Sequence, residues 1–223
     1  MDSAMTKIKT FLIIRSFFTP WETAQQYYMI CYIRIQKPWD FIDLAEDFPV
    51  MANKTNKITR IRTGGQSGVD RAAMEFAREQ NIPLCGWCPK NGWAEDYPDP
   101  PGVIGDYPDP PGLLADYPEL TETPSEDPAQ RTKWNMRDCD AILTIIPKNS
   151  KHSSGTEVGL QEGRLLGKPM YTAAGLEDVP GIIRWIKGLP DGTELCIGGP
   201  RESECNEAYD IAKAVLEAVA EAL

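Results

Sequence analysis

The residues most suited to chemistry form a glycine-rich turn, Gly64 to Arg71, with the sequence GGQSGVDR. The residues before it, 58–63, alternate apolar and polar side chains, which predicts a strand, and residues 72–79 predict a helix. Glycine lets a backbone approach an oxyanion closely, and the first N–H groups of a helix point toward it. The turn therefore predicts a binding site for a phosphorylated ligand.

Two further glycine loops follow predicted strands, at 153–157 (SSGTE) and 198–203 (GGPRES). Loops that follow parallel strands meet at one edge of a sheet, and ligands bind there where the strand order switches direction. Tight turns between strands and helices also favour glycine, so a purely structural interpretation is the alternative. The candidate ligand-binding residues from the three loops are Gly64, Gly65, Gln66, Ser67, Gly68, Asp70, Arg71, Ser154, Gly155, Thr156, Gly199, Arg201 and Ser203.

Within this set, Arg71 and Arg201 are the residues able to hold a phosphate through paired guanidinium hydrogen bonds. Asp70 has two interpretations. A carboxylate at a helix start is favoured by the helix dipole, and it could instead bind a hydroxyl or amino group of a ligand. The neutral hydrogen-bond donors are Gln66, Ser67, Thr156 and Ser203.

Cysteine and histidine residues predict little further chemistry. Cys85 and Cys88 form a C-x-x-C motif, but no second pair accompanies it, and the single histidine, His152, lies in another loop. A structural zinc site needs four ligands, so no structural metal is expected. The sequence has no Ser-His-Asp signature, and we assign no catalytic residue. The six cysteines predict reduced thiols in a cytoplasmic protein.

Strand and helix patterns alternate from residue 58 onward. This alternation predicts an α/β fold with a doubly wound, mainly parallel sheet and helices on both faces. Ser203 is the expected N-cap of the last helix. The predicted strands are 58–63, 83–87, 141–146, 169–172 and 193–197, and the predicted helices are 68–80, 128–138, 155–166, 179–188 and 203–222.

The chain divides into a predicted ligand-binding domain, 57–223, and an aromatic-rich extension, 1–56. The extension either packs on the domain as an added layer or lies upstream of a natural start at Met51. A proline-rich insertion occupies about 96–118, where DYPDPPG occurs twice and DYPE follows. Its proline density predicts an extended surface loop, with a partner-docking motif or a lid as the alternative.

The charge balance narrows the class of ligand. The formal net charge of −10 leaves no basic surplus to displace counterions, which argues against broad nucleic-acid binding. No apolar run reaches the roughly 18 residues that a membrane span needs. These features favour a cytoplasmic protein whose partner is a small anionic molecule, not nucleic acid or a membrane.

The turn from Gly64 to Ala73 resembles the opening motif of the molybdenum cofactor carrier proteins. That family belongs to a Rossmann-like superfamily that also contains the lonely-guy phosphoribohydrolases, which are lysine-decarboxylase-like, and DNA-processing protein A. The resemblance spans about residues 57–220, with further collinear matches at 86–90, 94–96, 117–123, 131–138, 155–156, 167–169 and 199–203.

The resemblance implies a Rossmann-like carrier that binds the pterin-based molybdenum cofactor, with its phosphate on a glycine loop, and protects or transfers it without catalysis. It also implies a homo-oligomer with molybdoenzymes or cofactor-synthesis proteins as partners, and it adds Lys90 to the candidate ligand-binding residues. The chain departs from the family at Gly92 and Trp93, where a basic pair is usual, and in its proline-rich insertion.

Two alternatives to a carrier are a hydrolase that cleaves the N-glycosidic bond of a nucleoside 5′-monophosphate and a nucleotide-ligand sensor. The phosphoribohydrolases carry a glutamate four residues after the glycine of their Gly-Thr motif, and counted from Gly155 this position is Gly159. A catalytic carboxylate must lie within about half an ångström of its productive place, so Glu157 and Glu162 are out of register. The carrier is therefore the favoured interpretation.

Overall fold

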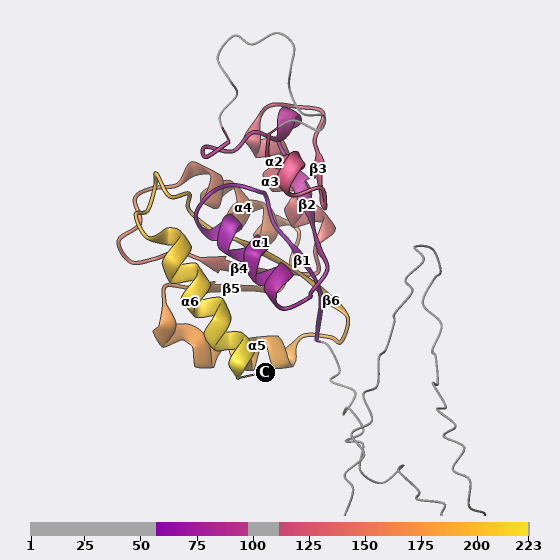
Figure 1. Ribbon diagram of the computed structural model, residues 1–223. Coiled ribbons are helices and arrows are strands. Elements are labelled where there is room, and N and C mark those ends of the chain that lie inside the picture. The colour runs from indigo at the N-terminus through magenta and orange to yellow at the C-terminus, as the bar shows by residue number, and fades with distance from the viewer. Residues whose placement is uncertain (1–56, 98–111, 223) are drawn as a thin grey trace, which may run out of the picture. The chain divides into compact units, whose positions relative to one another are not determined.

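The computed structural model describes residues 57–97 and 112–222, and within them a six-stranded parallel sheet forms the centre (Figure 1). The strand order is β3-β2-β1-β6-β4-β5, and every neighbouring pair is parallel. This is a Rossmann-like α/β fold, as the alternating pattern predicted. The strands are β1 (Ile58–Arg62), β2 (Leu84–Cys88), β3 (Leu120–Glu122), β4 (Ala141–Ile145), β5 (Met170–Ala173) and β6 (Thr193–Gly198).

Helices cover both faces of this sheet. The large apolar core joins one face to α1, α5 and α6, and Figure 1 shows α1 beside α6 in front of the strands. On the opposite face, α3 and α4 pack against each other and over β4. The helices are α1 (Val69–Glu79), α2 (Leu113–Asp116), α3 (Pro128–Asp138), α4 (Ser154–Leu165), α5 (Val179–Gly188) and α6 (Ala208–Glu221), with short 3-10 turns at Lys90–Gly92 and Leu176–Asp178.

Side-chain alternation in β4 explains how one strand serves both faces. Leu143 and Ile145 point into the large core, whereas Ile142 and Thr144 point toward α3 and α4. The connection through α3 carries the chain from β3 at one edge to β4, beyond β6. The carboxyl ends of β1, β6 and β4 therefore lie next to one another, and the three glycine loops meet there.

All the strands and helices predicted from the sequence are present, but two details are wrong. The last helix begins at Ala208, not at residue 203, and its N-cap is Glu207 with a positive φ of 67°. Ser203 lies in the turns before the helix and is not its N-cap, and its hydroxyl donates to the carboxylate of Glu95. The strand β3 was missed because its three residues are too few to show an alternating pattern.

The proline-rich insertion also differs from the expectation of an extended loop. Residues 98–111 lie outside the described part of the chain, but its last segment forms the helix α2. The side chains of Leu113, Leu114 and Tyr117 are buried in a second apolar cluster with Met74 of α1. This end of the insertion is thus part of the core, because a short run of leucines between the prolines supplies the apolar surface.

The described helices include none that is both long and apolar enough to cross a bilayer. The residues 1–56, for which the sequence left two interpretations, lie outside the described part of the chain.

The contact between β1 and β2 gives a stability prediction. Gly86 has φ +155°, and a Cβ there would lie 1.9 Å from the carbonyl oxygen of Thr63. We expect Gly86→Ala to lower the free energy of unfolding by about 1–3 kcal/mol, since the two strands must separate. Gly188→Ala, which meets nothing within 4 Å, is the matched control and should change it by less than about 1 kcal/mol. Urea unfolding measures both, and equal stabilities would contradict the prediction.

Candidate ligand-binding site

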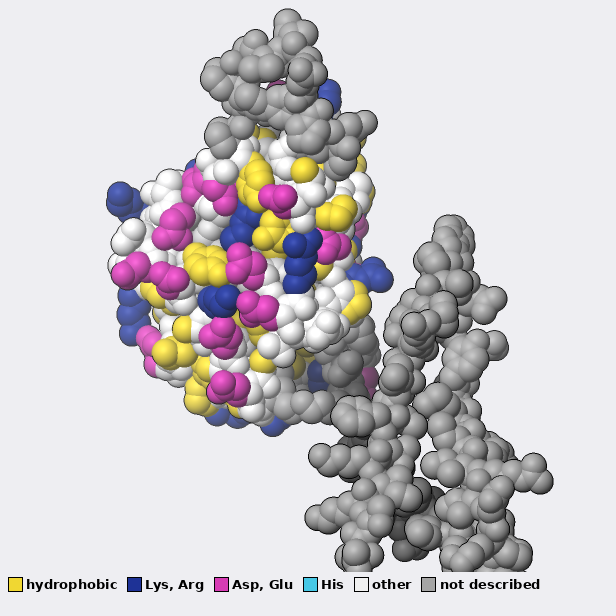
Figure 2. Space-filling view, in the orientation of Figure 1, with side chains coloured by type: hydrophobic (Ala, Val, Ile, Leu, Met, Phe, Trp, Pro, Cys, Tyr) yellow, Lys and Arg dark blue, Asp and Glu magenta, His cyan; other side chains and the backbone are white. Residues whose placement is uncertain are grey.

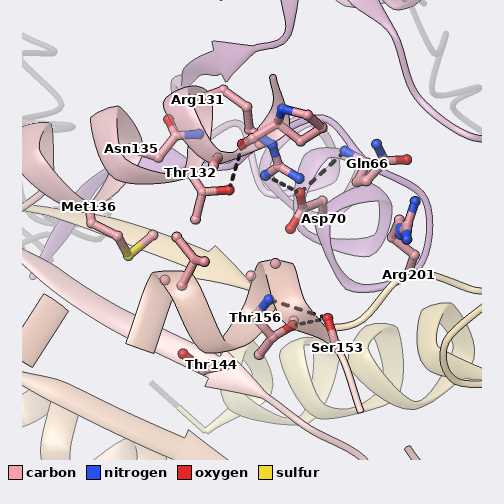
Figure 3. Close-up of a pocket in the computed structure, with 18 of the residues that line it drawn as sticks. Gln66, Asp70, Arg131, Thr132, Asn135, Met136, Thr144, Ser153, Thr156 and Arg201 are labelled. Atoms are coloured by element: carbon pink, nitrogen blue, oxygen red, sulfur yellow. Dashed lines mark hydrogen bonds and ion pairs between the residues drawn. The ribbon is translucent and has the colours of Figure 1, made fainter. Parts of the chain in front are cut away.

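A pocket of about 280 Å³ lies at the carboxyl edge of the sheet, on the face covered by α3 and α4. Its floor is formed by β4 and β6, with Thr144 and Cys196 among the residues that face it. Its walls are the glycine turn after β1, the first turns of α3 and α4, and the loop after β6 (Figure 3). All three predicted glycine loops contribute to this single pocket.

The glycine turn is tied to α3 by a buried ion pair. One guanidinium nitrogen of Arg131 lies 3.2 Å from Oδ2 of Asp70, and the two side chains are only 14% and 5% exposed. The same oxygen accepts a hydrogen bond of 3.2 Å from the backbone N–H of Gln66. Burial raises the pKa of Asp70, and the charge of Arg131 opposes that rise. Asp70 therefore has a partner that neither interpretation of the sequence included.

This ion pair explains why residue 64 is a glycine. A Cβ on Gly64 would lie 1.6 Å from the Nη1 atom of Arg131, so any larger residue would push the guanidinium away from Asp70. Residues 65 and 68 are glycines for a different reason. Both have positive φ, and a Cβ on either would lie under 3 Å from a neighbouring side chain or backbone atom. Much of the glycine turn thus follows from packing, as the structural alternative proposed.

At the start of α4, by contrast, packing does not explain the glycine. Ser153 caps the helix, since its Oγ accepts a 3.2 Å hydrogen bond from the N–H of Thr156. The N–H groups of Ser154 and Gly155 belong to the first turn, so they have no acceptor within the helix. A Cβ on Gly155 would meet nothing within 4 Å. Packing does not require a glycine here, and the bare backbone leaves room for an oxyanion at the positive end of the helix dipole.

A second helix start borders the same pocket. Asp127 caps α3, because its Oδ1 accepts a 2.9 Å hydrogen bond from the N–H of Ala129, and Pro128 occupies the first turn. Both residues line the pocket together with Ala129. Farther along α3, Asn135 bonds the N–H and carbonyl of Trp87 at 2.8 and 2.9 Å, which fixes the helix to β2. Two helix N-termini are therefore held at one cavity.

Arg201 contributes the second guanidinium to the pocket. Its Nη2 lies 3.0 Å from Oε1 of Glu204, and its Nε lies 3.8 Å from Oε2 of Glu95. Partial burial raises the pKa of Glu204, but hydrogen bonds from Arg201 outweigh that effect and lower it. Both arginines that line the pocket are thus paired with carboxylates of the protein, and the uncapped amides that border the pocket are those at the start of α4.

The structure brings together eight of the candidate residues predicted from the sequence. Residues that line the pocket are Gly64, Gln66, Asp70, Ser154, Gly155, Thr156, Gly199 and Arg201. Those that do not line it are Gly65, Ser67, Gly68, Arg71, Lys90 and Ser203. The ligand roles of these residues remain predictions.

Arg71 illustrates why a candidate can lie elsewhere. Its Nη2 bonds both carboxylate oxygens of Asp96 at 2.9 and 2.8 Å, and its guanidinium lies 4.9 Å and 5.0 Å from the ring centroids of Tyr97 and Tyr117. The arginine predicted to bind phosphate therefore fastens the two ends of the proline-rich insertion to α1.

The pocket also contains residues that the sequence interpretation missed, above all Arg131, Asn135 and Ser153. Arg131 and Asn135 are four residues apart on a predicted helix, which places them on one face. That signal is shared by many solvated helix faces, so it could not single them out. Ser153 belonged to a predicted loop but was not named, although a serine before a helix is a usual cap.

The position that carries glutamate in the phosphoribohydrolases also faces this pocket. Gly159 lines the cavity, and a Cβ there would lie 3.5 Å from Cγ2 of Thr132 and 3.9 Å from Sδ of Met136. Here α3 and α4 approach closely across a glycine, so the pocket wall presents methyl and thioether groups in place of a carboxylate.

The C-x-x-C motif lies in β2, where residues three apart point to opposite faces of the sheet. Cys85 lies near Glu194 and Cys88 packs in the second apolar cluster, and both are free thiols. Burial raises the pKa of each thiol to about 11, so both are protonated at neutral pH. This arrangement does not suit a shared metal or a mutual disulfide.

The fold and the site define a Rossmann-like ligand-binding protein. The chain belongs to the circularly permutated YpsA SLOG family, whose model matches residues 61–220. It is similar to the crystal structure of the "Putative molybdenum carrier protein" from Syntrophus aciditrophicus SB, with 29% sequence identity and a TM-score of 0.60, over 74% of this chain and 96% of that chain. A comparison with curated proteins gave no match. The resemblance inferred from the sequence is thereby confirmed.

The role of Gly64 gives a prediction for the ion pair. Gly64→Ala should displace the guanidinium of Arg131 and weaken its pair with Asp70, lowering the free energy of unfolding by about 1–3 kcal/mol, since Asp70 keeps only its hydrogen bond from Gln66. Gly155→Ala is the control from the same pocket, because its new methyl group meets no atom, and the change should be within about 0.5 kcal/mol. Denaturant unfolding of both variants tests this, and a Gly64→Ala protein as stable as wild type would overturn the assignment.

Proposed function

We propose that the pocket binds the molybdenum cofactor, an anionic pterin phosphate, and that the chain protects and transfers it without catalysis. The observation that carries the proposal is the start of α4, where the amides of Ser154 and Gly155 border the pocket and no side chain is required by packing. The name of the similar protein from Syntrophus aciditrophicus supports this choice of ligand.

The chemistry of the lining suits the two parts of such a ligand. A phosphate fits helix N-termini, which offer backbone donors and a favourable dipole. A flat heterocycle needs apolar contact with a few polar groups at its rim. The inner part of the pocket offers Met136, Ile142 and Val158 as apolar surface, with the hydroxyl of Thr144 beside them.

Hydrolysis of a nucleoside monophosphate has less support. A glycosidic bond is cleaved through a positively charged transition state that a well-placed carboxylate stabilises. The corresponding position in α4 is Gly159, and the carboxylates that line the pocket already have structural partners: Asp70 binds Arg131, Asp127 caps α3 and Glu204 binds Arg201. A nucleotide-ligand sensor would use the same pocket without turnover.

The proposal includes a cytoplasmic homo-oligomer that meets molybdoenzymes or cofactor-synthesis proteins, and no nucleic-acid or membrane partner. On the face shown in Figure 2, acidic and basic side chains are interspersed and do not form one basic patch. The pairs of Lys213 with Glu79 and of Arg78 with Glu119, at 2.9 and 2.8 Å, belong to α1, α6 and the segment before β3. Such paired charges do not favour a polyanion.

A charge placed at the start of α4 tests the proposal. Gly155→Asp keeps the helix stable, because its dipole favours an acidic residue, but the carboxylate would fill the place of the phosphate and repel it. We expect wild type to retain molybdenum cofactor in anaerobic co-elution and Gly155→Asp to lose at least about tenfold in affinity, or 1.4 kcal/mol.

The matched control is Gln161→Glu, which adds the same charge to an exposed position of the same helix and should bind like wild type. Failure of folded wild-type protein to retain the cofactor would refute the proposal. Release of adenine from AMP at a useful rate would favour the hydrolase instead.

A further inference from the structure

The carboxylate of Glu95 is enclosed by hydrogen-bond donors from two of the three glycine loops. Its Oε1 accepts from the hydroxyl of Ser67 and, at 3.1 Å, from the N–H of Ser203. Its Oε2 accepts from the hydroxyl of Ser203 at 2.5 Å, and Nε of Arg201 lies 3.8 Å from the same oxygen. Two hydroxyls, one amide and one guanidinium therefore converge on a single anion.

These donors form the kind of set that binds a phosphate. Hydroxyls, backbone N–H groups and arginine are the usual partners of phosphate oxygens in proteins. Ser67, Arg201 and Ser203 were predicted from the sequence as anion-binding residues, and the structure does place an anion among them, but one from the chain itself. Partial burial raises the pKa of Glu95, and the bonds from Ser203 and Ser67 outweigh this and lower it.

The cluster around Glu95 adjoins the pocket. Arg201 lines the pocket and also approaches Glu95, so the two places share one guanidinium. Trp93, two residues before Glu95, lines the pocket as well. The segment that bears Glu95 is held by one further bond, of 2.8 Å, from its N–H to Oε1 of Gln66. An anion bound in the pocket is therefore a near neighbour of this carboxylate.

We propose that Ser67, Arg201 and Ser203 form a second phosphate subsite, which Glu95 fills until a phosphate of the ligand replaces it. The ligand class that this implies is a form of the proposed pterin that carries a second phosphate group, with one phosphate at the start of α4 and the other here. The inference rests on the proposed function only in placing the first phosphate at α4, and it adds the second.

The exposure of Glu95 distinguishes a replaceable anion from a structural one. Its side chain is 20% exposed and that of Arg201 is 35% exposed, so both are reached from solvent. Asp70, which has a structural partner in the same site, is 5% exposed. A phosphate oxygen can accept from the same hydroxyls and amide, so exchange leaves no donor unpaired, and the released carboxylate regains its hydration.

Titration with inorganic phosphate tests the second subsite directly. It is carried out in the Gly155→Asp background, so that the site at α4 is closed. Glu95→Ala should bind phosphate at least about tenfold more tightly than the same background with Glu95 present, because the competing carboxylate is gone. Adding Ser203→Ala to Glu95→Ala should remove most of that gain.

The matched control is Asp96→Asn in the same background. It removes one negative charge from the adjacent residue, whose partner is Arg71 and not this cluster. Its phosphate affinity should stay as it was. A similar gain in Asp96→Asn would show a general effect of charge and would overturn the proposal.

Unchanged phosphate affinity in a folded Glu95→Ala protein, or a gain insensitive to Ser203→Ala, also overturns it. If Glu95→Ala does not fold, Glu95→Gln decides, because it keeps the shape and loses the charge; no gain there counts against the subsite. A gain in phosphate affinity without retention of molybdenum cofactor by wild type would support the subsite and refute the proposed function. Retention of the cofactor without a gain in phosphate affinity would support the proposed function and refute the second subsite.

Discussion

The buried ion pair between Asp70 and Arg131 is the contact on which the site depends. Asp70 lies at the start of α1, which packs on one face of the sheet, and Arg131 lies in α3, which packs on the other face. An ionised carboxylate that is 5% exposed would cost several kcal/mol without such a partner. The pair therefore fixes the distance between turn and helix, and it sets one wall of the pocket before any ligand arrives.

Because Arg131 and Arg201 are engaged by Asp70 and Glu204, the free backbone amides at the start of α4 are the donors that remain for an anion in the pocket. Amides have fixed directions, whereas a flexible cation adapts to many anions. A site of this kind selects by shape and by the position of oxygen atoms more than by total charge. This arrangement suits the anionic ligand that we propose for a protein with a net charge of −10.

The sequence was sufficient to predict the alternating α/β order and the edge at which the loops meet, since both follow from periodicity and parallel-strand geometry. It was insufficient where a residue's partner is distant in sequence. Arg71 was predicted to bind a ligand and Arg131 was missed, yet Asp96 holds the first outside the pocket and Asp70 holds the second in it. The start of α6 at Ala208 was misplaced because Ser203 is a good capping residue by type, whereas the chain passes through turns at 202–207 and the hydroxyl of Ser203 donates to Glu95.

The contacts of two tyrosine rings with Arg71 bear on how the repeat in this chain could arise by duplication. Tyr97 and Tyr117 are the tyrosines of the first DYPDPPG and of the DYPE that follows the second one, and both rings lie about 5 Å from the guanidinium of Arg71. The described residues on either side of 98–111 therefore contact the same side chain. A further copy inserted before α2 lengthens the connection between them, and doubling the length of a loop costs only about 0.6 kcal/mol. Duplication at this point therefore has little effect on the stability of the fold, so the chain can tolerate additional copies of the repeat here.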